Sequence, residues 1–309
     1  MHIRVLGSAA GGGYPQWNCN HPNSRSARLR EPGAAPRTQS SIAVSADGER
    51  WVLCNASPDL RQQINDNDVL HPKHGLRDSP IKAVVLTNAD VDHIAGLLTL
   101  RESQPLNLYA TRRVLDVLAA NSVFNVLNPK FVERLAFRLD EPLEIAGHDG
   151  AGLGIEVKPF TVPGKVALWL EDLSRGDNFG TVAEDTIALE IRDVGAERSL
   201  FYIPGCAAMT PELAERLRGA ALVLFDGTLW VDDEMIREKV GIKTGSRMGH
   251  MSISGPTGTM AAFEPLGVQR RVFIHINTTN PVLRDDSEER AIANRAGWEV
   301  SYDGMDITL

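Results

Sequence analysis

The chain has 309 residues, of which 43% are hydrophobic and 23% are charged, as is typical of a soluble globular protein with a sizeable core. Its net charge of −8 argues against a nucleic-acid partner, because an acidic surface repels phosphates. The amino terminus lacks the apolar stretch of a signal peptide, and no run of about 18 apolar residues occurs. We therefore expect a cytoplasmic protein with no membrane partner.

Short β-branched or apolar runs predict strands along the whole chain. In order, they span residues 3–6, 40–44, 51–56, 83–88, 107–110, 155–162, 186–191, 200–203, 222–227 and 271–276. Helical periodicity covers residues 58–66, 92–102, 111–120, 211–218, 255–265 and 286–296. Strands that come in blocks with helices interleaved favour an α/β protein with two sheets faced by helices. Segments 20–38 and 163–181 are rich in Pro, Gly, Ser and charge, and we expect long loops there.

Residues 87–93, "TNADVDH", have the outline of a metal-binding turn between a predicted strand and a predicted helix. Taken alone, Asp92 is better explained as a helix N-cap than as a metal ligand, and the alternative for His93 is a hydrogen-bonded histidine at a helix start. His275 comes at the end of the apolar run 271–276, where a rigid strand presents ligands. A buried histidine in that run otherwise needs another polar partner.

The turn resembles the T-H-x-H-x-D-H signature of the metallo-β-lactamase superfamily, which it matches at Thr87, Asp92 and His93. Further stretches resemble the family of pyrroloquinoline quinone (PQQ) biosynthesis B proteins along essentially the whole chain. They are "GSAAGGGYPQWNCN", "RTQSSIAV", "LCNASPDLRQQ", "TVPGK", "FYIPG", "FDGTLW", "GHMS" and "FIHINTTNP". The resemblance implies one metallo-β-lactamase-like domain over residues 1–309, an αββα sandwich of two mixed sheets flanked by helices.

The resemblance also shows which metal ligands are missing. In the superfamily, three histidines hold the first metal, and their places are taken here by Asn88, Asp90 and Lys165. A lysine ammonium repels a cation, so a hydrolytic site with two zinc ions is not expected.

The residues that the resemblance retains as metal ligands are Asp92, His93 and His275. Two imidazoles and one carboxylate on one metal are the pattern of non-haem Fe(II) oxygenases. The expected cofactor is Fe(II), with O2 as co-substrate, and another divalent metal such as zinc is an alternative occupant of the site.

The stretches "FDGTLW" and "MGHMS" resemble the acid and histidine that handle protons in the phosphodiesterase branch of the superfamily. Asp226 would orient His250, although a turn residue in an Asp-Gly pair explains Asp226 equally well. Asp90 is either an extra ligand or an acceptor for an imidazole N–H. Arg37 and Lys165 are candidates to hold substrate carboxylates, and the alternatives are a surface arginine and a solvated lysine.

A structural zinc clip, C-x-C-x-x-C, is frequent in the family near residue 20. This chain has Cys19, His21 and Ser24 there, and because serine is a poor zinc ligand, we expect the clip to be weakened or absent. The other cysteines, Cys54 and Cys206, are too widely spaced to form a disulfide framework with Cys19.

The resemblance implies a role in PQQ biosynthesis. The expected activity is an iron-dependent hydroxylation of the tyrosine ring in the cross-linked Glu–Tyr precursor, a peptide-derived small molecule. Two alternatives remain open: a carrier that assists transport of PQQ or its precursor to the periplasm, and a mononuclear metal hydrolase. Formation of a homodimer is also left open.

Overall fold

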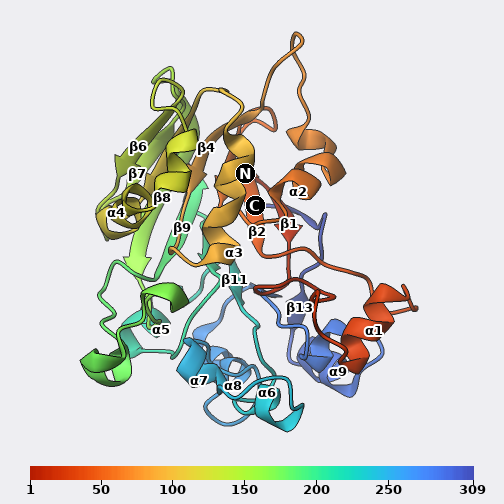
Figure 1. The fold of residues 1–309 in the computed structure, drawn as a ribbon. Coiled ribbons are helices and arrows are strands. Elements are labelled where there is room, and N and C mark those ends of the chain that lie inside the picture. Colours follow the sequence, from red (N-terminus) through yellow and green to blue (C-terminus); the bar gives the residue numbers. More distant parts are fainter.

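Two sheets of seven strands each lie face to face in the computed structural model of the chain (Figure 1), which describes residues 1–176 and 178–309 with their side chains. The first sheet contains, in spatial order, β14 (Asp306–Thr308), β1 (His2–Gly7), β2 (Ser41–Ser45), β3 (Trp51–Cys54), β4 (Ile81–Val85), β5 (Leu106–Ala110) and β6 (Val132–Ala136). The second contains β13 (Trp298–Val300), β12 (Arg270–Ile274), β11 (Leu222–Asp226), β10 (Leu200–Ile203), β9 (Ile187–Asp193), β8 (Gly152–Thr161) and β7 (Leu143–Ala146).

Both sheets are mixed and follow the same plan. In the first, the pairings from β14 to β3 are antiparallel and those from β3 to β6 are parallel. In the second, the pairings from β7 to β10 are antiparallel and those from β10 to β13 are parallel. Parallel neighbours need a crossover connection, and helices occupy these connections.

Helices cover the outer faces of the two sheets. On the first sheet lie α2 (Leu60–Asp66), α3 (Val91–Ile94) and α4 (Arg112–Ala120). On the second lie α5 (Pro211–Leu217), α8 (Thr259–Phe263) and α9 (Glu288–Arg295). The short helices α1 (Pro22–Arg28), α6 (Glu234–Arg237) and α7 (Gly245–Met248) belong to connecting segments, and α6 and α7 lie beside α8 at one end of the molecule (Figure 1). Among the described residues, no helix has both the length and the apolar character needed to cross a bilayer.

Short 3-10 helices complete the list of elements. They are η1 (Asp68–Leu70), η2 (Ala95–Leu100), η3 (Ser122–Val126), η4 (Leu168–Leu170), η5 (Leu173–Asn178), η6 (Glu264–Leu266) and η7 (Pro281–Leu283).

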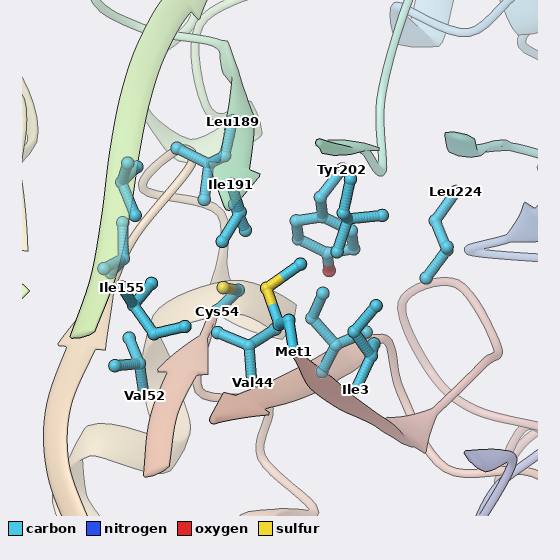
Figure 2. Packing of buried hydrophobic residues seen from close by; sticks show 14 of the residues in the cluster. Met1, Ile3, Val44, Val52, Cys54, Ile155, Leu189, Ile191, Tyr202 and Leu224 are labelled. Atoms are coloured by element: carbon cyan, nitrogen blue, oxygen red, sulfur yellow. The ribbon is translucent and has the colours of Figure 1, made fainter. Parts of the chain in front are cut away.

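The central core lies between the sheets. Figure 2 shows side chains of β1, β2 and β3 pointing toward those of β8, β9, β10 and β11. Helices also bury the outer faces, so a strand such as β2 is buried at every position and reads as a continuous apolar or small run. These layers form an αββα sandwich, which confirms the predicted fold class.

Each run predicted to be a strand overlaps an observed strand, whereas β6, β7, β13 and β14 were not predicted. They are the outermost strands of the sheets, and charged or polar residues interrupt sequences such as "VERLA" and "DIT", so no apolar run marks them. The expectation of a continuous loop over 20–38 was wrong, because helix α1 lies inside it. His21 caps that helix by accepting a hydrogen bond from the backbone N–H of Asn23, and Pro22 occupies its first turn.

Glu234 ties α6 to the loop that follows β12. The residue is 4% exposed, and its carboxyl accepts hydrogen bonds from the Trp230 backbone N–H at 2.6 Å and the Thr279 hydroxyl at 2.5 Å. Burial raises the pKa of Glu234 from 4.5 to about 7. The folded protein therefore binds more protons than the unfolded chain between these values, and its stability falls as the pH rises through this range.

We expect Glu234→Gln to remove this part of the pH dependence, because the amide does not ionise. Between pH 4.5 and pH 7, ionisation of this carboxyl should lower the free energy of unfolding of the parent by on the order of 3 kcal/mol. The variant should not show this decrease. Urea unfolding at several pH values between pH 5 and pH 8 measures the difference. Identical pH profiles for the two proteins would contradict the expectation.

Candidate metal centre

The turn 87–93 follows β4 and is fixed by the segment that follows β3. The Asn55 side chain donates to the Thr87 hydroxyl at 2.9 Å and accepts from the Thr87 backbone N–H at 2.9 Å. Because α3 begins at Val91, Asp92 and His93 lie in its first turn. The turn and the short helix thus present both side chains from the carboxyl end of a parallel strand.

His275 follows β12 directly and has a φ of 60°, in the left-handed region that non-glycine residues seldom adopt. The Thr228 hydroxyl holds it there, because it lies 2.9 Å from both the backbone carbonyl oxygen and Nδ1 of His275. Such strained backbone is concentrated at functional sites, where the surrounding structure compensates for its cost.

The three residues predicted as metal ligands lie together. Nε2 of His275 is 3.2 Å from Oδ2 of Asp92, and Nε2 of His93 is 3.9 Å from the same oxygen. One candidate ligand atom from each residue lies within 4.8 Å of the other two. Asp92 and His93 come from the first sheet and His275 from the second, so the cluster forms only when the two sheets face each other.

The tautomer of His93 is set by Asn88, which sequence reasoning treated only as a lost ligand. Asn88 Oδ1 lies 2.9 Å from the backbone N–H of Asp90 and 2.7 Å from Nδ1 of His93. The oxygen accepts both hydrogen bonds, so Nδ1 of His93 carries the proton and Nε2 carries a lone pair. Nε2 is buried and has no hydrogen-bond partner among the described residues. An unpaired lone pair beside a carboxylate and a second imidazole fits a bound metal cation.

In the metal-free protein, the electrostatics of the cluster keep Asp92 ionised and His93 neutral, whereas they bias His275 toward its protonated form. Burial acts to raise the pKa of Asp92, but His93 and His275 outweigh it and hold that pKa below its ordinary value. Burial lowers the pKa of His93 to about 4, so its imidazole is neutral at pH 7. Burial lowers the pKa of His275, but the hydrogen bond to Asp92 outweighs it and raises that pKa above its ordinary value.

Asp226 and His250 form a second pair next to the cluster. Nδ1 of His250 lies 2.6 Å from Oδ2 of Asp226, and the His250 ring stacks on His275 with centroids 5.2 Å apart. Asp226 ends β11, is fully buried and also accepts from the Cys206 backbone N–H at 2.9 Å and the Thr228 hydroxyl at 2.6 Å. These contacts fix the carboxylate, which in turn orients the imidazole.

Thr228 was not recognised in the sequence, although it belongs to the quoted stretch "FDGTLW". Its hydroxyl lies within hydrogen-bond distance of Asp226, His250 and His275. A threonine that directly follows an Asp-Gly turn is the only sequence signal for this role, and that signal is weak.

A cavity of about 420 Å³ opens beside these groups and is lined by Asp90, Asp92, His93, Lys165, His250 and His275, among others. Asp90 Oδ1 accepts from the Leu168 backbone N–H at 3.0 Å, and burial raises the Asp90 pKa. Lys165 is paired with Glu171 at 2.9 Å.

Arg37 lies elsewhere. It is buried, donates to the backbone carbonyl of Ser301 and is absent from the described lining of the cavity. Arg37 therefore connects two segments of the chain. It does not line the cavity, where it was a candidate to hold a substrate carboxylate.

The segment considered for a structural zinc clip is held by hydrogen bonds. The two ring nitrogens of His21 contact the Asn23 backbone N–H at 3.2 Å and Glu238 at 3.0 Å. The Ser24 hydroxyl pairs with that of Thr278 at 2.8 Å. These contacts connect α1 to α6 and to the loop after β12.

Comparisons with known proteins identify the family of the chain. The family model described as "Beta-lactamase superfamily domain" matches residues 50–276. A coenzyme PQQ synthesis protein B from Xanthomonas oryzae pv. oryzae is 58% identical over 309 residues, which cover 100% of both chains. The chain belongs to the coenzyme PQQ synthesis protein B family. Another member, from Gluconacetobacter diazotrophicus, is 55% identical and is matched over 100% of this chain and 99% of its own.

One solved structure also supports the family, and a more distant one shares the fold. The crystal structure of Zn(2+)-bound PqqB from Methylobacterium extorquens has a TM-score of 0.94 and 52% identity, and the match covers 100% of both chains. A diphosphatase from the PhnP family, at 22% identity and a TM-score of 0.66, shares the fold, with 99% of this chain and 96% of its own covered. The resemblance identified in the sequence is therefore confirmed.

We expect Asn88→Ala to weaken metal binding about 10- to 100-fold, because His93 loses the acceptor that fixes its ring and its tautomer. Asn88→Asp is the matched control, since its carboxylate still accepts from Nδ1 and should keep the affinity at or above that of the parent. Competition between the protein and a chromophoric chelator for Zn(II) measures both variants. Equal affinities for Asn88→Ala and the parent would mean that the contact does not support the ligand.

Proposed function

We propose that the protein acts in PQQ synthesis as a non-haem Fe(II)-dependent hydroxylase of the tyrosine ring in the cross-linked Glu–Tyr precursor. The observation that carries this proposal is the donor set of Asp92, His93 and His275, in which the buried Nε2 of His93 has no protein partner among the described residues. Two imidazoles and one carboxylate leave coordination positions open, as in non-haem Fe(II) oxygenases. The full-length similarity to coenzyme PQQ synthesis B proteins supports the pathway.

In this proposal the metal is held by Asp92, His93 and His275. Asn88 orients the imidazole of His93 through Nδ1, and Thr228 orients that of His275 in the same way. Iron bound there would supply activation of O2, and the zinc-bound relative supports divalent metal binding in this family. Lys165 lines the cavity and pairs with Glu171, so at this former histidine position it supplies no ligand for a second metal. These features favour a mononuclear centre.

His250 is proposed to move protons. Its Nδ1 donates to Asp226, which leaves Nε2 to take a proton from the phenol of the precursor or to return one. Each hydroxylation places one atom of O2 on the ring, and the other leaves as water after uptake of two protons and two electrons from a reductant. Asp90 lines the same cavity and is a second candidate for this proton traffic.

A mononuclear metal hydrolase is the second candidate function. The Asp226–His250 pair favours it, because a positioned carboxylate and imidazole also serve ester hydrolysis. The third candidate function, a carrier of PQQ or its precursor, requires only a cavity that binds the molecule. The three functions differ in their need for metal and O2.

The decisive experiment reconstitutes the protein with Fe(II) under anaerobic conditions, adds the cross-linked Glu–Tyr and a reductant, and then admits isotopically heavy O2. The proposal predicts a product whose mass rises by the labelled oxygen. Turnover without O2, or label taken only from heavy water, would support the hydrolase. Tight binding with no turnover under any of these conditions would support the carrier.

A further inference from the structure

Lys165 and Lys243 both line the cavity, but their surroundings differ. Lys165 Nζ lies 2.9 Å from Oε1 of Glu171, and Arg247 contacts the two oxygens of the same carboxylate at 3.2 and 2.7 Å. The hydrogen bond from Arg247, with help from Lys165, lowers the pKa of Glu171 to about 2. Glu171 is therefore ionised at pH 7, and the positive charge of Lys165 already has a partner.

Lys243 has no such partner among the described residues. Its side chain is half-buried, and the segment between α6 and α7 presents it to the cavity. The backbone on both sides is fixed: Gly241 N–H donates to the Met235 carbonyl at 3.2 Å, and Gly245 N–H donates to the Asp232 carbonyl at 2.8 Å. Lys243 therefore places a cation at the wall of the cavity with no protein partner among the described residues.

The charges around the cavity favour an anionic ligand for this lysine. A divalent cation would be balanced by the carboxylates of Asp92 and Asp90, which line the same space. The Lys165 charge is balanced by Glu171. The Lys243 ammonium then remains as the uncompensated charge among the described lining residues.

We propose that Lys243 determines specificity by binding a carboxylate of the precursor. Met235 and Met248, which line the cavity near this segment, offer apolar surface to the remainder of the molecule. The inference rests on the proposed function for the identity of the substrate, and it deepens that function by assigning the residue that recognises the substrate's negative charge.

Equilibrium binding tests the proposal without turnover. The cross-linked Glu–Tyr is titrated into the Zn(II)-loaded protein in the absence of O2, with the parent, Lys243→Met and Lys239→Met compared. Lys239 is exposed on the same segment and does not line the cavity, so Lys239→Met is the matched control. We expect Lys243→Met to raise Kd about 10- to 100-fold, as for the loss of a hydrogen bond between charged groups. Lys239→Met should leave Kd unchanged.

An analogue of Glu–Tyr with its carboxylates converted to amides separates charge recognition from general damage. The parent should bind the analogue weakly, and Lys243→Met should weaken that binding no further. Lys243→Arg should restore most of the affinity for the carboxylate form. Equal metal content and equal melting temperatures establish that the variants are folded.

The outcomes separate this proposal from the proposed function. If Kd depends on Lys243 as expected but iron and O2 give no hydroxylated product, the hydroxylase proposal fails and the assignment of Lys243 stands. If the parent binds Glu–Tyr and Lys243→Met binds it equally well, the assignment is wrong whatever the reaction. The assignment is also wrong if Lys243→Met loses affinity equally for the amide analogue, or if the parent does not bind Glu–Tyr.

Discussion

Replacement of His93 or His275 by alanine should abolish stoichiometric iron binding and hydroxylation while the protein stays folded. Each substitution removes one of three proposed ligands, and two remaining donors cannot hold the metal tightly. His93→Ala also removes the buried hydrogen bond from Nδ1 to Asn88, at a cost of about 1–3 kcal/mol, so folding of the variant is checked beside its metal content. A histidine that served only the core would lose stability in the same way but would leave metal binding unchanged.

His275 needs an additional variant because its φ of 60° strains any alanine placed there. His275→Gly removes the ligand without that strain, so loss of metal in both variants identifies the imidazole as the cause. His71→Ala serves as the control at an exposed histidine that does not line the cavity. Metal analysis of the purified proteins, with thermal unfolding of the metal-free forms, gives the answer. Normal turnover with Fe(II) in a variant of His93 or His275 would exclude that residue as a ligand.

His250→Ala should keep its metal and lose turnover by a factor of about 10² to 10⁴, the usual contribution of a positioned acid–base group. The imidazole stacks on His275 and contacts Asp226, and we assign it to proton transfer. Measurement of iron stoichiometry beside single-turnover rates separates the two roles. Loss of metal from His250→Ala would make His250 a ligand, and the proposed site of three residues would be incomplete.

Asp226→Asn should reduce turnover more mildly than His250→Ala. The buried carboxylate lies 2.6 Å from Nδ1 of His250 and also accepts from the backbone N–H of Cys206. In the variant, an amide nitrogen in place of Oδ2 would face two N–H donors, from His250 and Cys206. The imidazole of His250 would then move its proton to Nε2 or rotate away from residue 226. The unfavourable contact also costs about 1–3 kcal/mol of stability. Rates are therefore compared well below the melting temperature, and a variant with the parent's single-turnover rate would show that Asp226 does not orient His250.

The sequence was informative wherever the physical signal is local. Buried strands such as β2 and β12 read as apolar runs because both of their faces are covered, and the runs were found. Edge strands such as β6 and β14 have no such run. Their pairing depends on a neighbour distant in the chain, as in the register of Ile3 with Ile307. Patterns within one segment do not carry that information.

The site shows the same division. The turn at 87–93 and the end of the run at 271–276 were visible as separate candidates, and the family resemblance joined them. The contact of Asn88 with His93 and the pairing of Lys165 with Glu171 depend on side-chain directions that the sequence does not specify. Asn88 stands where the superfamily has a histidine ligand, and the sequence indicated only that this ligand is lost. The structure shows that Asn88 instead contacts the ring of His93.

The placement of the proposed ligands on both sheets makes a bound cation a crosslink between the two halves of the sandwich. Asp92 and His93 belong to the half that carries β4, and His275 belongs to the half that carries β12. Ligands that bind only the folded state stabilise it by mass action, by about 2.7 kcal/mol at a free concentration one hundred times Kd. Iron, zinc and other divalent ions can thus be ranked by the heat resistance they confer on the protein, before any substrate or oxygen is added.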